Sequence, residues 1–314
     1  MAGIQIMAFR FFRPRPQRLI AHLSGLPGKS FTDKQDELYK LYDCCGDDVK
    51  SETTNGKRFT SHVSPFMAVD EWDELLDRLI LKIWNEKGLP EKLDKAMVQA
   101  FAAEFVKALM EGLGEFTDTD SEPNKEFIDR LTNDVWQFSA AKTYQQMKDI
   151  TQLLVDGAGK LRTYRDFKFE AGKINEEYVG PWLQAEYNNA VAASQMGAKW
   201  QTIWKDKKAL PYLRYDTVGD NRVRPDHQQM EGIIRRVDDP FWKTHFPPNG
   251  WNCRCDVRQL DEGIETDLSK LSIPDVPPMF LFNAGIEGMI FPKNHPYYDG
   301  LPKNISKQVK EIQL

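Results

Sequence analysis

The segment from Tyr212 to Leu260 constrains the fold of this chain more than any other, because it gathers residue types that are rare elsewhere in it. It holds two of the four cysteines, two of the five histidines and two of the eight tryptophans, together with a Pro-Pro step. Runs of β-branched and aromatic residues at 213–218 and 233–237 predict two short strands. Between them, Pro225 suits the first turn of a short helix and Gly232 suits its end.

A third strand is predicted at 252–258, where apolar and polar residues alternate. Side chains two positions apart share a face of a strand. One predicted face carries Trp251, Cys253, Cys255 and Val257, and the other carries Asn252, Arg254, Asp256 and Arg258. The three strands and the short helix predict a small antiparallel sheet within a mixed α+β module.

The rest of the chain shows helical periodicity. Apolar residues recur with a helical spacing over 71–87 and 92–113. Further helices are predicted at 31–49, 126–138, 141–155 and 176–205. The expected fold class is therefore α+β, with a helix-rich N-terminal half followed by the small mixed module. We expect three parts, namely a basic flexible arm at 1–30, a helical domain at 31–165 and an α+β domain at 166–314.

Four short motifs, in a fixed order, carry a resemblance to a known family. They are Asp216-Thr217 with Gly219-Asp220-Asn221-Arg222-Val223-Arg224, His227 with Glu231-Gly232, Asp239-Pro240-Phe241-Trp242, and Pro247-Pro248-Asn249-Gly250-Trp251-Asn252-Cys253-Arg254-Cys255. The segment resembles the head-morphogenesis domain of the phage Mu F protein family, the minor head proteins of tailed phages. The resemblance continues upstream over 182–204. By this resemblance, the motif residues with a structural role are Asp220, Gly232, Trp242, Pro247, Pro248 and Trp251.

The resemblance implies a minor capsid protein that acts in head morphogenesis of a tailed phage or prophage. It implies association with the portal protein and the major capsid protein, in the host cytoplasm during assembly and then in the virion, at the head interior or the portal vertex. Packaging with the DNA for ejection is a further implied role. A membrane location is not expected, because no apolar run approaches the roughly 20 residues that cross a bilayer.

Two cysteines and two histidines of the central segment are candidate zinc ligands. Cys253 and Cys255 share a predicted strand face, and zinc takes thiolate and imidazole ligands in tetrahedral geometry, so His227 and His245 could complete the site. The alternative is that the cysteines pack in the interior and His227 only fixes the neighbouring loop. The spacing of one residue between the cysteines is shorter than the usual two to four, so both interpretations stay open.

Other polar residues of the segment suggest binding or catalysis. Arg222, Arg224 and Arg254 are candidate contacts to phosphate or to a partner's carboxylate, although a solvated surface explains them as well. An enzyme, a hydrolase or a transferase, would use His227 and Asp220 with the first two arginines. The chain lacks the phosphate-loop, nucleophile-elbow, H-E-x-x-H and Rossmann glycine motifs, which favours a non-enzymatic role.

A DNA-binding accessory role rests on the N-terminal residues. Residues 1–32 hold five basic residues and no acidic one, interleaved with phenylalanines and prolines, and such an arm could contact packaged DNA or an acidic protein surface. An unstructured terminus is the alternative. The whole chain has a net charge of −5, which argues against a dedicated non-specific DNA-binding protein.

Overall fold

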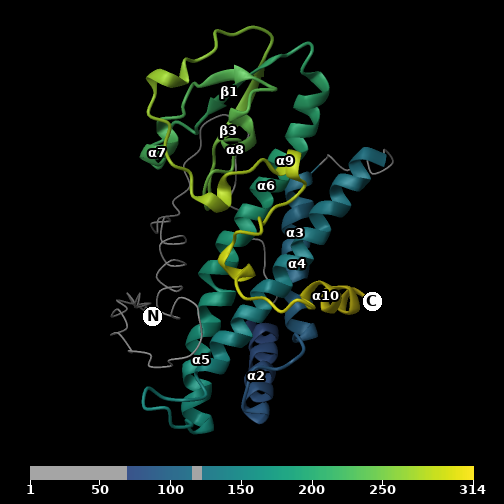
Figure 1. Cartoon of the computed structure of the whole chain (residues 1–314), viewed down its shortest axis with the longest axis vertical. Helices are drawn as coiled ribbons and strands as arrows, with labels where there is room; N and C mark the ends of the chain where they lie inside the picture. Colours follow the sequence, from purple (N-terminus) through teal and green to yellow (C-terminus); the bar gives the residue numbers. More distant parts are fainter. Residues whose placement is uncertain (1–68, 115–121) are drawn as a thin grey trace, which may run out of the picture.

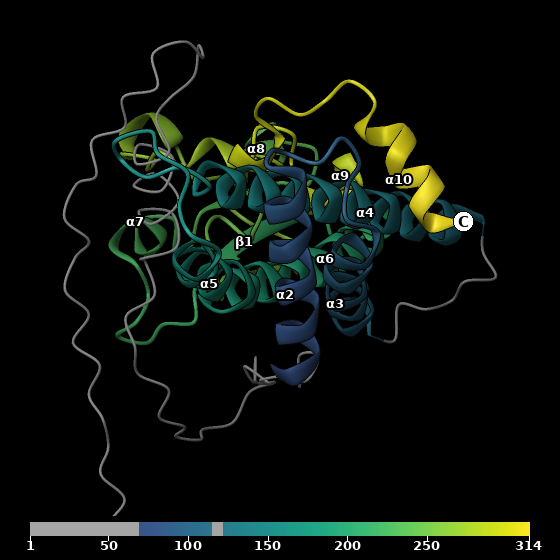
Figure 2. The ribbon, with the colours of Figure 1, turned by 90° about the horizontal axis from the view of Figure 1, so that it is seen from below.

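An elongated bundle of helices carries the small sheet at one end (Figure 1). The computed structural model describes residues 69–114 and 122–314. The long helices in these residues are α2 (Val69–Glu86), α3 (Lys95–Leu113), α4 (Glu122–Gln152), α5 (Tyr164–Val179) and α6 (Pro181–Asp206). Seen along the bundle, α2 lies obliquely across the others (Figure 2). The predicted basic arm and the helix predicted at 31–49 lie outside the described residues.

Helix α4 is one continuous helix of 31 residues. The predicted break between residues 138 and 141 is wrong. Ser139 donates its hydroxyl hydrogen bond to the Val135 carbonyl, and Thr143 donates to the Ser139 carbonyl, each at 2.8 Å. These polar side chains therefore satisfy themselves on the preceding turn of the same helix and do not interrupt it. By contrast, the segment predicted as one helix at 176–205 is divided at Gly180, where Pro181 begins α6.

Helices α3 and α6 approach each other closely at Gly112. A Cβ atom on Gly112 would overlap the carbonyl oxygen of Val191 and the Cβ of Ser194 on α6. Gly172 in α5, in contrast, has no atom within 4 Å of the place its Cβ would occupy. The two helical glycines therefore form a matched pair.

Alanine at these two glycines should act in opposite directions on stability. Gly112→Ala is expected to lower the free energy of unfolding by about 1–3 kcal/mol, because the helix backbones must separate. Gly172→Ala is expected to raise it by roughly 0.5–1 kcal/mol, because alanine is the better helix former. Denaturant unfolding of both variants checks this, and equal effects of the two substitutions would contradict the close approach.

The C-terminal segment leaves the sheet and returns along the bundle to α10 (Figure 1). Its short elements are η1 (Leu268–Lys270), η2 (Pro278–Phe280), α9 (Ala284–Glu287), η3 (Pro296–Tyr298) and α10 (Ile305–Gln313). Buried side chains of α4 hold it in place. Asp134 accepts hydrogen bonds from the backbone N–H groups of Ile290 and Phe291, each at 2.8 Å, and the Phe291 ring stacks on Phe138 at 3.6 Å.

A fully buried ion pair joins α4, α6 and η3 inside the bundle. The ammonium of Lys142 lies 2.8 Å from Oε2 of Glu186, and both side chains have an exposed fraction of 0%. The Tyr297 hydroxyl donates to the other carboxylate oxygen at 2.9 Å. Burial lowers the pKa of Lys142, and the charge of Glu186 opposes that shift. This polar cluster therefore links three elements that are far apart in sequence.

The sheet has three antiparallel strands in the order β2-β1-β3. These are β1 (Tyr212–Asp216), β2 (Ile234–Arg236) and β3 (Asp256–Leu260). In the register, Leu213 lies opposite Arg235 on one side and Gln259 on the other. Together with the helices this arrangement confirms the predicted α+β fold class. None of the helices in the described ranges is long and apolar enough to cross a membrane.

The strand predicted at 252–258 begins only at Asp256. The predicted alternation persists as burial, since Cys253, Cys255 and Val257 are buried and the residues between them are partly exposed. Asn252 has a φ of 52°, which turns the chain at the start of the predicted strand. Trp251 consequently belongs to the core of the helix bundle, while the two cysteines belong to a second core beneath the sheet. The prediction that all four side chains share one face is wrong for Trp251.

Candidate functional site

Two cysteine thiols and a histidine converge beneath the sheet. His227 lies on the short helix α7 (Pro225–Gln228), and Cys253 and Cys255 lie just before β3. Nδ1 of the histidine is 3.6 Å from Sγ of Cys253 and 3.3 Å from Sγ of Cys255. All three side chains are buried, and their candidate ligand atoms lie within 4.8 Å of one another. Three of the four predicted metal ligands therefore meet in space.

The fourth predicted ligand, His245, lies elsewhere. It follows helix α8 (Phe241–Thr244), and its ring stacks on Phe241 with 4.7 Å between centroids. Its Nδ1 is 2.8 Å from the Thr244 hydroxyl. Burial lowers the pKa of His245. Among the described residues, the group of candidate ligands does not include this histidine.

The two cysteine thiols interact, and their pKa values shift in opposite directions. The Cys255 thiol hydrogen-bonds to Cys253, and this contact, with support from His227, lowers the pKa of Cys253 well below its usual value despite burial. The same contact and burial raise the pKa of Cys255. Burial also raises the pKa of neighbouring Tyr215, whose hydroxyl donates to Asn249 at 2.9 Å. The two thiols therefore lie among buried polar side chains.

Arg224 closes the other side of the histidine. Its Nη1 lies 3.3 Å from Nε2 of His227, and its Nη2 donates to the carbonyl oxygen of Trp251. A Cβ atom on Gly250 would overlap the Arg224 guanidinium, so glycine is needed for this approach. The loop that carries Pro247 and Pro248, both buried, thus packs around the arginine. Arg224 acts inside the module here and is not a free surface group.

The other two predicted contact arginines surround Asp220. Arg254 binds the Asp220 carboxylate through two nitrogens, at 2.7 and 2.8 Å, and Arg222 lies 3.6 Å away. The hydrogen bonds from Arg254 are the main reason that the pKa of Asp220 is lowered to about 2. The structure therefore brings Asp220 and Arg254 together as an internal pair. Phosphate or partner contact through Arg222 and Arg254 stays a prediction.

This pair predicts a measurable pH dependence. Because the pKa of Asp220 is depressed in the folded chain from 3.8 to about 2, its contribution to stability is complete above 3.8 and is lost as the pH falls through about 2. Arg254→Ala should return the pKa of Asp220 towards 3.8, whereas Arg222→Ala should change it less. NMR titration of the carboxyl carbon measures both shifts. An unchanged pKa in Arg254→Ala would show that the pair does not form in solution.

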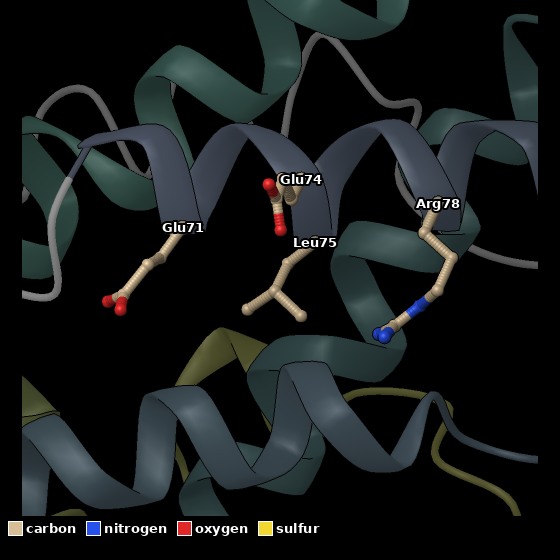
Figure 3. Close-up of a pocket in the computed structure, with 4 residues that line it drawn as sticks. All are labelled: Glu71, Glu74, Leu75 and Arg78. Carbon is tan, nitrogen blue, oxygen red and sulfur yellow. The ribbon is translucent and has the colours of Figure 1, made fainter.

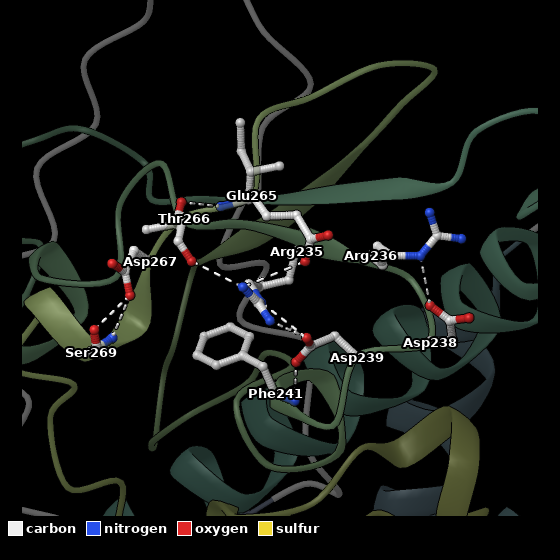
Figure 4. Close-up of polar contacts among 10 residues, drawn as sticks. Arg235, Arg236, Asp238, Asp239, Phe241, Glu265, Thr266, Asp267 and Ser269 are labelled. Atoms are coloured by element: carbon white, nitrogen blue, oxygen red, sulfur yellow. Dashed lines mark hydrogen bonds and ion pairs between the residues drawn. The ribbon is translucent and has the colours of Figure 1, made fainter.

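A further arginine network was not foreseen from the sequence (Figure 4). Arg235 of β2 lies 2.5 and 3.0 Å from the Asp239 carboxylate and donates to the Thr266 carbonyl at 3.0 Å. Asp239 in turn accepts from the Phe241 N–H at 2.8 Å. The network ties β2 to the start of α8 and to the segment after β3. The Asp239-Pro240 motif marked one member of this network in the sequence. The contact between Arg235 and Thr266 could not be predicted from local spacing, because these residues are remote in sequence.

The remaining structural motif positions have packing or conformational roles. Trp242 is fully buried in the core beneath the sheet. Trp251 packs its ring edge-on against Phe280 at 5.3 Å. Gly232 has a φ of 76°, a value that non-glycine residues rarely adopt. These positions shape the module around the cysteine–histidine cluster.

A surface hollow lies far from this cluster along the sequence. It has a volume of about 320 Å³ and is lined by Glu71, Glu74, Leu75 and Arg78. All four side chains project from one side of α2 (Figure 3). Their spacing is that of a single helix face. None of the predicted site residues contributes to it.

Comparison with known proteins places the cluster inside a recognised domain. Residues 139–258 match the family described as Phage Mu protein F like protein. The chain is 33% identical over 109 residues to the putative capsid assembly protein F of Escherichia phage Mu. It is 52% identical over 52 residues to the Mu-like prophage FluMu F protein of Haemophilus influenzae. No solved structure matches the chain.

These matches cover parts of longer proteins. The alignment takes in 35% of this chain and 22% of the phage Mu protein, and 17% of this chain and 13% of the Haemophilus protein. An uncharacterized protein of Methanocaldococcus jannaschii is 24% identical over 195 residues, which are 60% of this chain and 27% of that protein. The family match begins within α4 and ends in β3, so it includes α7, the two cysteines and most of the sheet. Residues 139–258 are therefore similar to the Phage Mu protein F like family, and the chain spans less than a quarter of the length of either Mu F relative that it matches.

Proposed function

We propose that this chain takes part in assembling the head of a tailed phage or prophage. The observation that carries the proposal is the match of residues 139–258 to the Phage Mu protein F like family. The relative from phage Mu, to which the chain is 33% identical over 109 residues, is named as a putative capsid assembly protein. The chain covers only 22% of that protein, so the role of the whole relative enters here as part of the proposal.

The proposed partners are the portal protein and the major capsid protein. The chain would meet them in the host cytoplasm during assembly and stay in the virion, at the head interior or the portal vertex. Release with packaged DNA at ejection is the second stage at which it would act. The basic arm at 1–30, which is the predicted DNA contact, lies outside the described residues and stays a prediction.

The helical domain predicted at 31–165 is the proposed docking part, and the α+β domain predicted at 166–314 carries the family motifs. One hydrophobic core contains side chains from both, such as Phe138 and Tyr178. Truncation near residue 165 would expose this core. Experiments on docking therefore need the full chain and substitutions on its surface.

The enzyme alternative gains no support from the geometry of its four residues. Asp220 is held by Arg254, and His227 is 4% exposed with both ring nitrogens in contact with protein groups. Arg224 is engaged with the Trp251 carbonyl. A general base must reach a substrate proton, and a buried, fully engaged imidazole does not. The family match likewise supports a non-enzymatic role.

Co-expression tests the proposal. The full chain is produced with the portal and major capsid proteins of the same phage, and the assembled shells are separated by velocity sedimentation. We expect the chain to sediment with the shells when the partners are present and to stay at the top of the gradient when it is expressed alone. A high-salt wash of the shells removes protein that is bound non-specifically through surface charge. A folded chain that stays at the top with every combination of partners would contradict the proposal.

A further inference from the structure

We propose that His227, Cys253 and Cys255 bind a zinc ion that ties helix α7 to the start of strand β3. The proposal rests on the geometry of three buried side chains from two separate segments. It concerns the internal architecture of the domain and is independent of which head protein the chain contacts. Each proposal can therefore fail without the other.

The distances match those of a tetrahedral zinc site. With zinc bonds of about 2.3 Å to sulfur and about 2.0–2.1 Å to nitrogen, two ligands at a tetrahedral angle lie about 3.5 Å apart for a sulfur and a nitrogen. The Nδ1 atom of His227 lies 3.6 Å from Cys253 Sγ and 3.3 Å from Cys255 Sγ. Both cysteines thus stand at the separation that a shared ion requires.

Hydrogen bonding alone accounts less well for this convergence. A neutral imidazole carries one ring proton, so its Nδ1 either donates one hydrogen bond to a sulfur or accepts one from a thiol. One divalent ion satisfies both sulfurs and the nitrogen at once. Two thiolates and one neutral imidazole also make the site electrically neutral when zinc is bound, which suits its position in the core beneath the sheet.

The surroundings supply support for such ligands. The backbone N–H of Asn249 hydrogen-bonds to the sulfur of Cys253, and the Tyr215 hydroxyl contacts Cys255. Groups of this kind orient and stabilise zinc ligands from the second layer of contacts. The three protein ligands leave a fourth position, which we assign to a water molecule or to Tyr215, because zinc sites with three protein ligands retain a fourth ligand.

Zinc binding changes the role of Arg224. Coordination through Nδ1 leaves the ring proton of His227 on Nε2, and an arginine nitrogen cannot accept a hydrogen bond. With the ion bound, Arg224, whose Nη1 lies 3.3 Å from Nε2, would therefore be held by its bond to the Trp251 carbonyl and not by a bond to the histidine.

Metal analysis of the purified full chain is the direct test. Protein made in zinc-supplemented cells and purified without chelator should carry about one zinc per chain, which survives gel filtration. Cys253→Ser, Cys255→Ser and His227→Ala should each lose most of this zinc. His245→Ala is the matched control, because it removes a histidine of the same module that lies outside the cluster, and it should retain the ion.

A second measurement covers the case in which the variants fail to fold. Cobalt(II) added to the metal-free wild-type chain should give thiolate-to-cobalt charge transfer and tetrahedral d–d absorption, and zinc should displace it. A chelator should lower the denaturant midpoint of the wild-type chain. Folded wild-type protein without zinc or cobalt binding, zinc that is lost on gel filtration, or an intact Cys253–Cys255 disulfide in protein from a reducing cytoplasm would each overturn the proposal.

Discussion

Glu186→Ala is expected to lower the free energy of unfolding by about 3–5 kcal/mol, the range seen when one partner of a buried ion pair is removed. The substitution leaves the Lys142 ammonium at 0% exposure without its counterion, whose carboxylate oxygen lies 2.8 Å away in the native chain. It also removes the acceptor of the Tyr297 hydroxyl, at 2.9 Å. Equilibrium unfolding in urea measures the change, provided that two probes give coincident transitions.

Two controls separate the buried charge from the loss of side-chain volume. Lys142→Met with Glu186→Leu removes both charges and keeps apolar bulk, and it should recover most of the lost stability. Glu170→Ala breaks the exposed pair with Lys173, in which the two side chains are 33% and 55% exposed, and should cost at most about 0.5 kcal/mol. A cost below about 1 kcal/mol for Glu186→Ala would mean that the pair is hydrated or open in solution.

The second large effect is a loss of stability at acidic pH that originates in His295. Burial, aided by the charge of Lys142, lowers its pKa from 6.5 to about 3. The unfolded chain binds a proton at this histidine as soon as the pH falls below about 6.5, whereas the folded chain does so only near 3. The contribution of the neutral His295 to the free energy of unfolding is therefore complete above pH 6.5 and is lost progressively between pH 6.5 and about 3. Each unit of pH in this window costs up to about 1.4 kcal/mol.

His295→Asn isolates this effect from the titration of other groups. Nδ1 of His295 accepts the Tyr297 N–H at 3.1 Å at the start of η3, and an asparagine oxygen can accept the same bond without titrating. As the pH falls through the window, the free energy of unfolding of the wild type should fall relative to that of the variant, by several kcal/mol in total. Stability curves that run parallel from pH 6.5 to 3 would contradict the buried, neutral histidine.

Local sequence patterns predicted most helices and strands, but not every place where an element begins, ends or continues. The strand near 213–218 and the helix over 71–87 appear as β1 and α2, because apolar periodicity reports directly on a buried face. The break expected near residue 140 does not exist, since the hydroxyls of Ser139 and Thr143 bond within the helix. Whether such a side chain interrupts a helix depends on contacts that local spacing does not contain.

The candidate site shows the same division. The shared face of Cys253 and Cys255 follows from alternation, and the structure brings the predicted ligand His227, 26 residues before Cys253, next to them. His245 is closer than His227 to the cysteines in sequence, yet its ring stacks on Phe241. Closeness in sequence does not decide which way a side chain points. The buried Lys142–Glu186 ion pair could not be predicted from the sequence, because charged residues in helices are ordinarily exposed.

The most direct test of the central claim is the protein composition of particles made by the phage or prophage that encodes this chain. Procapsids and filled heads are purified from an induced lysate, and their proteins are quantified by mass spectrometry. We predict that the chain is present at a constant ratio to the portal protein in procapsids or in filled heads. Its presence in the soluble lysate together with its absence from both kinds of particle would contradict a role in head assembly.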